Sequence, residues 1–340
     1  MNVCRTPFRI RYSASATLSI PSRANGFYRH SISARGRGLM ARIRIKHVDA
    51  FTTTPHTGNP AGVVPDGGSL SEREMQGIAR EMNLSETAFI LPPTSPEADL
   101  RIRWFTPTTE VPLCGHATIA GFHSLAEEGG LNMTKGGRYQ FRLETASGIL
   151  PVDVTKNNGL ISIMFGLNLP AFDRAIHYKI DLVRVLNLTL SEFENHIPIL
   201  RSDYLFVPVK RLHTLFSIRP NFLTMANFLD SRNLRGLCVF TTETVDRDSI
   251  VHSRFFAPNQ GINEDPVTGS SHAGLAVQLF ESGFLDIKNG RCVFQAEQGD
   301  AIGRRGRITV ELEVVDDKPV GVKIGGNAVT VLEGEMLLHD

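Results

Sequence analysis

A duplicated phrase constrains the fold of this 340-residue chain more than any other feature. The first copy occupies residues 103–129 and the second occupies residues 254–283. Five residues recur at a constant offset of 154: Glu110, Pro112, Gly115, Glu127 and Gly129 return as Glu264, Pro266, Gly269, Glu281 and Gly283. This period is far longer than the roughly 20–50 residues of solenoid repeats. We therefore expect two similar halves, with a pair of related sites that face each other.

Both copies continue into an apolar segment of helical length. Residues 115–126 and 269–280 leave no polar face, whereas a helix on the surface would carry one, so we expect two buried helices. Strand-like segments surround them, at residues 139–143, 149–154, 161–165, 207–209, 237–240, 308–314 and 320–324. The sequence therefore predicts an α+β fold of two pseudo-symmetric lobes. Each lobe is a curved sheet wrapped around one central helix, and a cleft lies between the two lobes.

Local signals predict further elements in the first lobe. Ser71 and Glu74 have the spacing of a capping box, which opens a helix that runs to about Met82. The apolar alternation of residues 42–51 predicts a strand, and residues 61–64, 87–91 and 100–105 have the composition of further strands.

The first forty residues differ in composition from the rest. They contain seven Arg and six Ser but no Asp or Glu, which is typical of a mitochondrial or plastid transit peptide. The alternative is an upstream extension of a protein that starts at Met40. In either case we exclude residues 1–40 from the fold and expect them to be disordered. We expect a cytoplasmic protein, or a plastid or mitochondrial one if the segment acts as a transit peptide.

Charge and cysteine usage exclude several classes of function. Residues 41–340 carry 29 basic and 35 acidic residues, a net charge of −6, which is unfavourable for binding nucleic acid. No apolar run approaches the roughly 18 residues of a membrane span. The four cysteines form no CxxC pair and the eleven histidines no HExxH motif. We therefore expect no disulfide framework and no metal.

The start of each buried helix is a candidate binding site. The first N–H groups of a helix have no partner within it, and the helix dipole adds positive potential there. Two such starts in one cleft would suit a carboxylate. Gly115 and Gly269 would let backbone approach a ligand, and Ser270 and Ser271 could add hydroxyl donors. The alternative is that these glycines only serve tight turns before core helices.

The repeat does not by itself identify the residue that carries the proton. Cys114 and Thr268 occupy matching positions, where two thiols could act as the opposed bases of a racemase. Threonine has no useful pKa near neutrality, so Thr268 cannot serve as the second base. We therefore interpret Cys114 as a small buried residue. The remaining candidates are Glu86, His116, Asp265 and His272.

Each candidate also has a structural interpretation. A histidine beside an apolar helix is usually a satisfied structural residue, and an Asp before a proline, as at Asp265, commonly forms a turn or cap. Glu86 lies in an apolar and hydroxyl-rich stretch, where partial burial would raise its pKa and suit it to acid–base work. Otherwise Glu86 lies on a solvated strand edge.

Taken together, these segments resemble the phenazine-biosynthesis PhzF-like family, whose relatives include diaminopimelate epimerase. The resemblance covers about residues 45–335 and rests on five segments in order. They are Val48-Asp49-Ala50-Phe51-Thr52 with Gly58-Asn59-Pro60-Ala61, Asn83-Leu84-Ser85-Glu86-Thr87-Ala88-Phe89, Cys114-Gly115-His116-Ala117-Thr118, Glu264-Asp265-Pro266-Val267-Thr268-Gly269-Ser270, and Glu297-Gln298-Gly299 with Gly303-Arg304. One departure is Arg304-Arg305-Gly306, where the family segment usually reads Arg-Pro-Ser.

The resemblance implies a function as well as a fold. It implies a diaminopimelate epimerase-like homodimer that isomerises a small conjugated carboxylate by proton transfer, without a cofactor. Glu86 would then be the shuttling acid/base, with His116 and Asp265 orienting and polarising the substrate. Gly115, Gly269 and Ser270 would bind it. The alternatives are a two-base racemase or epimerase that uses Cys114, and a non-catalytic metabolite-binding protein.

The expected domain organisation follows from these interpretations. The N-terminal lobe spans residues 41–170 and is completed by a C-terminal strand near residues 327–338. The C-terminal lobe spans residues 171–326. We expect neither nucleic acid nor a membrane as a partner.

Overall fold

The computed structural model of the chain describes residues 41–338 apart from 176–177, and all of these fall within one compact unit, Ser31–Asp340. The predicted N-terminal extension, residues 1–40, lies outside the described residues. The helices are α1 (Glu72–Met82), α2 (Gly115–Glu127), α3 (Lys179–Leu186), α4 (Leu212–Ser217), α5 (Phe222–Asp230) and α6 (Gly269–Glu281).

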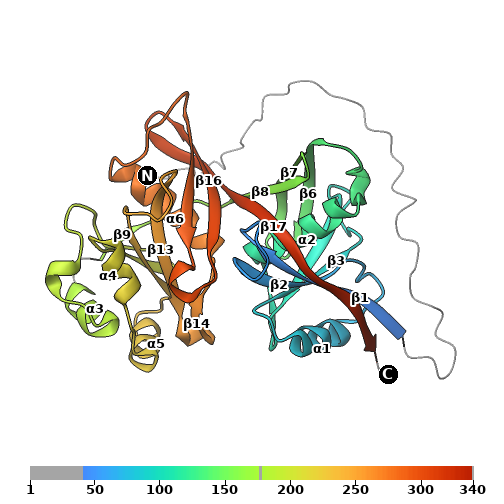
Figure 1. The fold of residues 1–340 in the computed structure, drawn as a ribbon, viewed down its shortest axis with the longest axis horizontal. Coiled ribbons are helices and arrows are strands. Elements are labelled where there is room, and N and C mark those ends of the chain that lie inside the picture. The colour runs from blue at the N-terminus through green and yellow to red at the C-terminus, as the bar shows by residue number, and fades with distance from the viewer. Residues whose placement is uncertain (1–40, 176–177, 339–340) are drawn as a thin grey trace, which may run out of the picture. The chain divides into compact units, whose positions relative to one another are not determined.

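Strands make up most of the remaining regular structure (Figure 1). The first nine are β1 (Ala41–Ala50), β2 (Asn59–Val64), β3 (Thr87–Leu91), β4 (Leu100–Phe105), β5 (Glu110–Val111), β6 (Gly137–Thr145), β7 (Gly148–Asn157), β8 (Leu160–Leu167) and β9 (Asp173–Arg174). The others are β10 (Leu200–Arg201), β11 (Tyr204–Pro208), β12 (Gly236–Thr241), β13 (Ser249–Ala257), β14 (Ile262–Asp265), β15 (Arg291–Gln298), β16 (Gly306–Val315) and β17 (Lys318–Leu338).

Strands of the first half close into a ring around α2. The pairing order is β1-β2-β3-β4-β6-β7-β8-β17, and β17 returns to pair with β1. Most neighbours are antiparallel, but β2–β3 and β4–β6 are parallel. A closed ring leaves no free edge and places the inward side chains against the central helix.

The second half repeats this pattern. Its order is β9-β10-β11-β12-β13-β15-β16-β17, with β11–β12 and β13–β15 parallel. The short strand β14 pairs with β13 as β5 pairs with β4. The duplication seen in the sequence is therefore a duplication of strand topology, and the predicted α+β fold of two similar lobes is confirmed.

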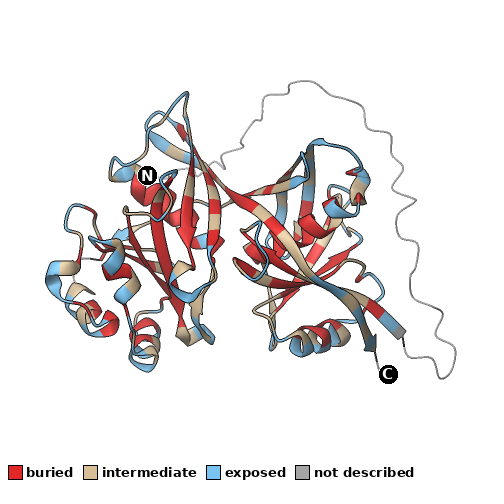
Figure 2. Cartoon of the chain, viewed as in Figure 1, coloured by how far each residue is buried: buried red, intermediate tan, exposed pale blue. Residues whose placement is uncertain are grey.

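The central helices are buried along almost their whole length (Figure 2). In α2 every residue from His116 to Ala126 except Leu125 is buried, and in α6 every residue from Ser271 to Leu279 is buried. Neither helix begins with a side-chain cap. No capping side chain therefore satisfies the first N–H groups of these two helices. A ligand-binding site at a helix N-terminus requires the absence of such a cap.

An arginine–glutamate pair explains much of the repeated phrase. Arg103 donates from Nε and Nη2 to both carboxylate oxygens of Glu110, at 2.6 Å each. In the second copy, Arg254 donates in the same way to Glu264, at 2.8 and 2.7 Å. Each pair links a strand of the sheet to the short strand that precedes a central helix. It therefore fixes the position of the turn from which the helix begins.

The predicted first helix is confirmed, including its cap. The Ser71 hydroxyl accepts a hydrogen bond from the Glu74 N–H at 3.3 Å, and the Glu74 carboxylate accepts from the Ser71 N–H at 2.7 Å. The helix ends at Asn83, which adopts the left-handed conformation. Met75, Ile78 and Ala79 form its buried face.

No helix in the described part of the chain is long and apolar enough to cross a membrane. The predicted lobe boundaries, homodimer and compartment stay predictions.

Strand β17 is the element that both halves share. Its residues 318–325 pair with β16, residues 322–327 pair with β8, and residues 328–338 pair with β1. Residues 322–325 therefore have partners on both edges. At Gly325 the crowding is greatest, because a Cβ atom there would lie 1.9 Å from the Ile163 carbonyl oxygen and 2.5 Å from Met164 Sδ.

We predict that Gly325→Ala destabilises the fold strongly. The clashing atom at 1.9 Å belongs to backbone that is fixed in the sheet, so the added methyl cannot be accommodated by a side-chain rotation. Overpacking of this kind should lower the free energy of unfolding by about 3 kcal/mol. Urea denaturation followed by circular dichroism measures the change.

Gly334→Ala is the matched control, because Gly334 lies in the same strand and a Cβ there meets nothing within 4 Å. The midpoint of urea denaturation of Gly334→Ala should stay close to that of the wild type. Equal urea midpoints for the two variants would contradict the conclusion that neighbouring backbone crowds Gly325.

Candidate active site

The two helix starts meet, as the repeated phrase predicts. A Cβ atom built on Gly115 would lie 4.0 Å from the Gly269 Cα, and one on Gly269 would lie 2.3 Å from Ile324 Cδ1. At Gly269 a side chain would displace the end of the Ile324 side chain, whereas a Cβ on Gly115 would come no closer than 3.3 Å, to Phe165. The N-termini of both helices therefore come close together at this point.

Glu86, His116 and Cys114 form a cluster beside the start of α2. His116 Nε2 lies 3.3 Å from Glu86 Oε2 and 3.3 Å from the Ser85 hydroxyl, and Nδ1 lies 3.4 Å from Cys114 Sγ. The Glu86 side chain is only 14% exposed, so it does not lie on the solvated strand edge that was its alternative interpretation.

Cys114 and Glu86 contact the two nitrogen atoms of the His116 ring. Burial, followed by the charge of Glu86, raises the pKa of the Cys114 thiol well above its usual range, so the thiol keeps its proton. Its Sγ lies 3.4 Å from Nδ1, and Glu86 Oε2 lies 3.3 Å from Nε2. These two contacts limit the orientation of the ring.

The same three residues have the spacing of a metal site. Their ligand atoms lie within 4.8 Å of one another. A metal bound here would be held by the Cys114 thiolate, one nitrogen of His116 and the Glu86 carboxylate, and it would displace the thiol proton.

Asp265 approaches this cluster from the second half of the chain. Burial raises the pKa of its carboxyl group, and the charges of His116 and Glu86 also act on it, which places the three groups in one electrostatic environment. Asn59 donates to Asp265 Oδ1 at 2.8 Å, and the Thr268 hydroxyl donates to Oδ2.

Asn59 and Gln298 support Asp265, although sequence reasoning gave neither a role. Asn59 Nδ2 also donates to the Val267 carbonyl at 2.8 Å. Gln298 is fully buried, donates to the Asp265 carbonyl at 2.7 Å and accepts from the Thr268 N–H at 3.1 Å. The signal available in the sequence was their place in the Gly-Asn-Pro and Glu-Gln-Gly segments of the resemblance.

Arg304 fastens the loop before Asn59 to the second half. It donates to Asp49 Oδ1 at 2.7 Å and to the carbonyl groups of Thr57 and Gly58 at 3.0 Å each. The next residue, Arg305, where the sequence departs from the family segment, instead contacts Asp246. The departure therefore does not touch Glu86, His116 or Asp265.

Ser270 and His272 lie on α6 but differ in their surroundings. The Ser270 hydroxyl is 3.0 Å from the Tyr204 hydroxyl in an exposed contact. His272 is buried, donates from Nδ1 to the Thr268 carbonyl at 2.8 Å, and has Nε2 3.4 Å from the Ser253 hydroxyl. Burial lowers the pKa of His272 to about 4, and its contacts with Thr268 and Ser253 are those of a structural residue.

Comparisons with known proteins agree with this fold. A family model described as phenazine biosynthesis-like protein, PhzC-PhzF, matches residues 48–334. An uncharacterized isomerase of Clostridium acetobutylicum is 39% identical over 307 residues, covering 88% of this chain and all of the relative. The isomerase YddE of Escherichia coli K12 is 32% identical and covers 87% of this chain and 99% of its own.

Solved structures give the same result. A Bacillus anthracis phenazine biosynthesis protein of the PhzF family has a TM-score of 0.78 and 32% identity, covering 87% of this chain and 99% of its own. A hydroxyproline epimerase from Agrobacterium vitis has a TM-score of 0.55 at 14% identity, over 87% of this chain and 91% of that one, which shows a shared fold alone.

Fold and relatives together define an isomerase of the epimerase-like class. Within that class, the chain belongs to the phenazine biosynthesis-like PhzF family.

We predict that Asp265→Asn stabilises the folded protein at pH 7. The pKa of Asp265 is raised in the folded state, so the carboxyl favours folding when protonated and opposes it when ionised. This support for folding is complete below the unfolded pKa and is lost as the pH rises through the folded pKa. The variant should therefore be more stable than the wild type near neutrality.

The gain should shrink as the pH falls through the folded pKa of Asp265. Thermal or urea denaturation at several pH values measures it, with the exposed Asp173→Asn as control. A variant that is less stable than the wild type at pH 7 would show that the hydrogen bonds to Asp265 outweigh the burial of its charge.

Proposed function

We propose that this isomerase moves a proton between carbon atoms of a small conjugated carboxylate, without a cofactor, and that Glu86 carries the proton. The observation that carries the proposal is the 3.3 Å contact between Glu86 and His116 at the start of α2, where α6 also begins. It brings a poorly exposed carboxylate, able to accept and return a proton, to a place suited to an anionic substrate.

The helix starts would bind the substrate. The backbone N–H groups of Gly115 and Gly269 lie at the N-termini of α2 and α6, the positive ends of two helix dipoles, which favours a carboxylate. Ser270 is exposed at the second start and can add a hydroxyl donor. A ligand held by both starts would contact both halves at once.

His116 and Asp265 would orient the substrate and polarise its polar groups. His116 presents a ring whose direction is fixed through Cys114 and Glu86. Asp265 is held on both oxygens by Asn59 and Thr268. Groups fixed in this way need little reorganisation when charge develops on the substrate.

A two-base racemase mechanism has less support. It needs a second base opposite Cys114, and the matching residue is Thr268. It also needs a thiolate, whereas burial raises the pKa of the Cys114 thiol well above its usual range. A single-carboxylate mechanism avoids both requirements.

Glu86→Gln should abolish proton transfer. A panel of small unsaturated and aromatic carboxylates is first screened for thermal stabilisation of the wild type, and each compound that stabilises it is incubated in D₂O. We expect deuterium in the recovered compound with the wild type, and a rate about 10²–10⁴-fold lower with Glu86→Gln, because the amide cannot accept a proton. Mass spectrometry measures the incorporation. Glu81→Gln, an exposed change in α1, is the control.

Cys114→Ala separates the two mechanisms. Under the single-carboxylate mechanism it should slow exchange by no more than about tenfold, since the thiol only orients His116. Cys238→Ala controls for the loss of a buried thiol elsewhere. Exchange that survives in Glu86→Gln but disappears in Cys114→Ala would overturn the proposal in favour of the thiol.

A further inference from the structure

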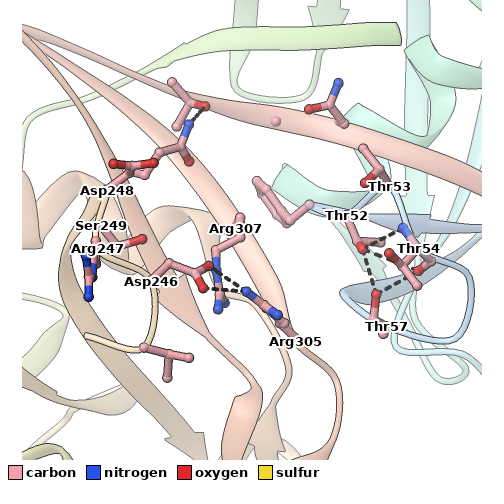
Figure 3. A pocket seen from close by; sticks show the side chains of 16 residues that line it. Thr52, Thr53, Thr54, Thr57, Asp246, Arg247, Asp248, Ser249, Arg305 and Arg307 are labelled. Atoms are coloured by element: carbon pink, nitrogen blue, oxygen red, sulfur yellow. Dashed lines mark hydrogen bonds and ion pairs between the residues drawn. The ribbon is translucent and has the colours of Figure 1, made fainter. Parts of the chain in front are cut away.

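A cavity of about 990 Å³ lies apart from the helix starts. Five segments line it: the loop after β1, the segment from the β12–β13 loop to the start of β13, Gln295 of β15, residues 305–309 at the start of β16, and residues 326–327 of β17. Figure 3 shows the threonines of the β1 loop on one wall, facing Asp246, Arg305 and Arg307 on the other. We call it the Thr–Arg pocket. Its volume is that of a small-molecule site.

The Thr–Arg pocket is separate from the candidate active site. Glu86, His116 and Asp265 do not line it. Phe51 borders both places, because it lines the pocket while its ring lies against the start of α6, 3.5 Å from where a Cβ on Gly269 would be. The Phe51 side chain is fully buried. It acts as a wall between the two sites.

Carboxylates hold the pocket's arginines in fixed positions. Arg305 Nη2 donates to both oxygens of Asp246 at 2.6 Å, and Arg307 Nε donates to the same carboxylate at 2.6 Å. Arg307 also donates to Asp300, at 3.0 and 3.1 Å. Arg307 and then Arg305 lower the pKa of Asp246, which therefore stays ionised. Guanidinium groups held in this way lose little entropy when a ligand binds.

Arg305 and Arg247 keep unused donor capacity. The Arg305 side chain is 53% exposed, and its hydrogen bonds within the described residues involve Nη2 alone. A guanidinium has five N–H groups, so those on Nη1 are available to a ligand, while Nε lies 4.0 Å from Asp300 Oδ1. Arg247 is exposed and makes no hydrogen bond or ion pair with the described residues.

Exposed guanidinium groups on the lining favour an anion. Three arginines, at positions 247, 305 and 307, line the pocket with two aspartates, at 246 and 248, and Asp300 outside the lining balances Arg307. The attraction for an anion therefore comes from the exposed side chains of Arg247 and Arg305 and not from a net positive charge.

Hydroxyl groups complete the donor set on the opposite wall. The Thr52 and Thr57 hydroxyls lie 2.6 Å from each other. Thr53 and Thr54 are exposed, and their hydroxyls form no hydrogen bond with other described residues. An oxyanion between Arg305 and this wall would therefore accept hydrogen bonds from both sides.

We propose that the Thr–Arg pocket is a binding site for a small oxyanion, either a phosphate or a carboxylate. Arg305 and Arg247 supply charge-assisted donors, and the threonine wall supplies neutral ones. The site goes beyond the proposed isomerase reaction and does not depend on it. It adjoins that reaction's machinery, because the same loop continues to Asn59, which holds Asp265.

Isothermal titration calorimetry of the full chain at low ionic strength tests this site, with sodium phosphate in one arm and sodium succinate in the other. We expect at least one of them to bind the wild type. We also expect Arg305→Gln to weaken that binding by about tenfold or more, because a charged hydrogen-bond donor is lost. Arg247→Gln should weaken it less, since no carboxylate holds Arg247 in place. Arg138→Gln, an exposed change on β6, is the control.

The outcomes are distinct. Binding of phosphate alone, succinate alone or both supports the site and identifies its ligand class, provided that Arg305→Gln weakens it and Arg138→Gln does not. Binding that Arg305→Gln leaves unchanged would place the anion elsewhere, for example at the helix starts, and overturn the proposal. Absence of binding in both arms would also overturn it. Thr53→Val is a second variant, which should weaken binding without altering any arginine contact.

Discussion

The fold depends on the approach of two helix starts that carry no side chain where they meet. Gly115 and Gly269 come so close that even a methyl group would contact the other glycine or the Ile324 side chain. This approach joins the two sheets through their central helices as well as through β17. It also brings the N-termini of both helices to one point, where their dipoles favour negative charge.

The two halves share a strand topology but contribute different functional groups to the candidate active site. Matching arginine–glutamate pairs fix equivalent turns, from which the two central helices begin. Beyond that, the first half presents Glu86 and a ring held by a protonated thiol, while the second presents a buried carboxyl group supported by Thr268 and Gln298. Duplication thus explains the geometry of the site, and divergence within the copies explains why its groups are unequal.

Local and periodic signals predicted much of this structure. The α1 cap depends on residues three positions apart, and the buried helices are visible as apolar segments, so both could be recognised from the sequence. The supports of the site could not. Asn59 and Asp265 are 206 residues apart, and Arg304 and Asp49 are 255 apart. Such contacts depend on how the halves pack, and an Asn or Arg carries no local pattern that names its partner. The Thr–Arg pocket, built from five segments, was unpredictable for the same reason.

The shared strand has a consequence for how the chain folds. Strands β1 and β8 both pair with β17, whose last residues end at Leu338. Until the ribosome has made that strand, the ring around α2 stays open and two hydrogen-bonding edges are exposed, which invites pairing with other chains. The first half, although synthesised first, therefore finishes last. Such long-range closure is slow, so a chaperone that shields these edges during synthesis would protect the protein at its most vulnerable stage.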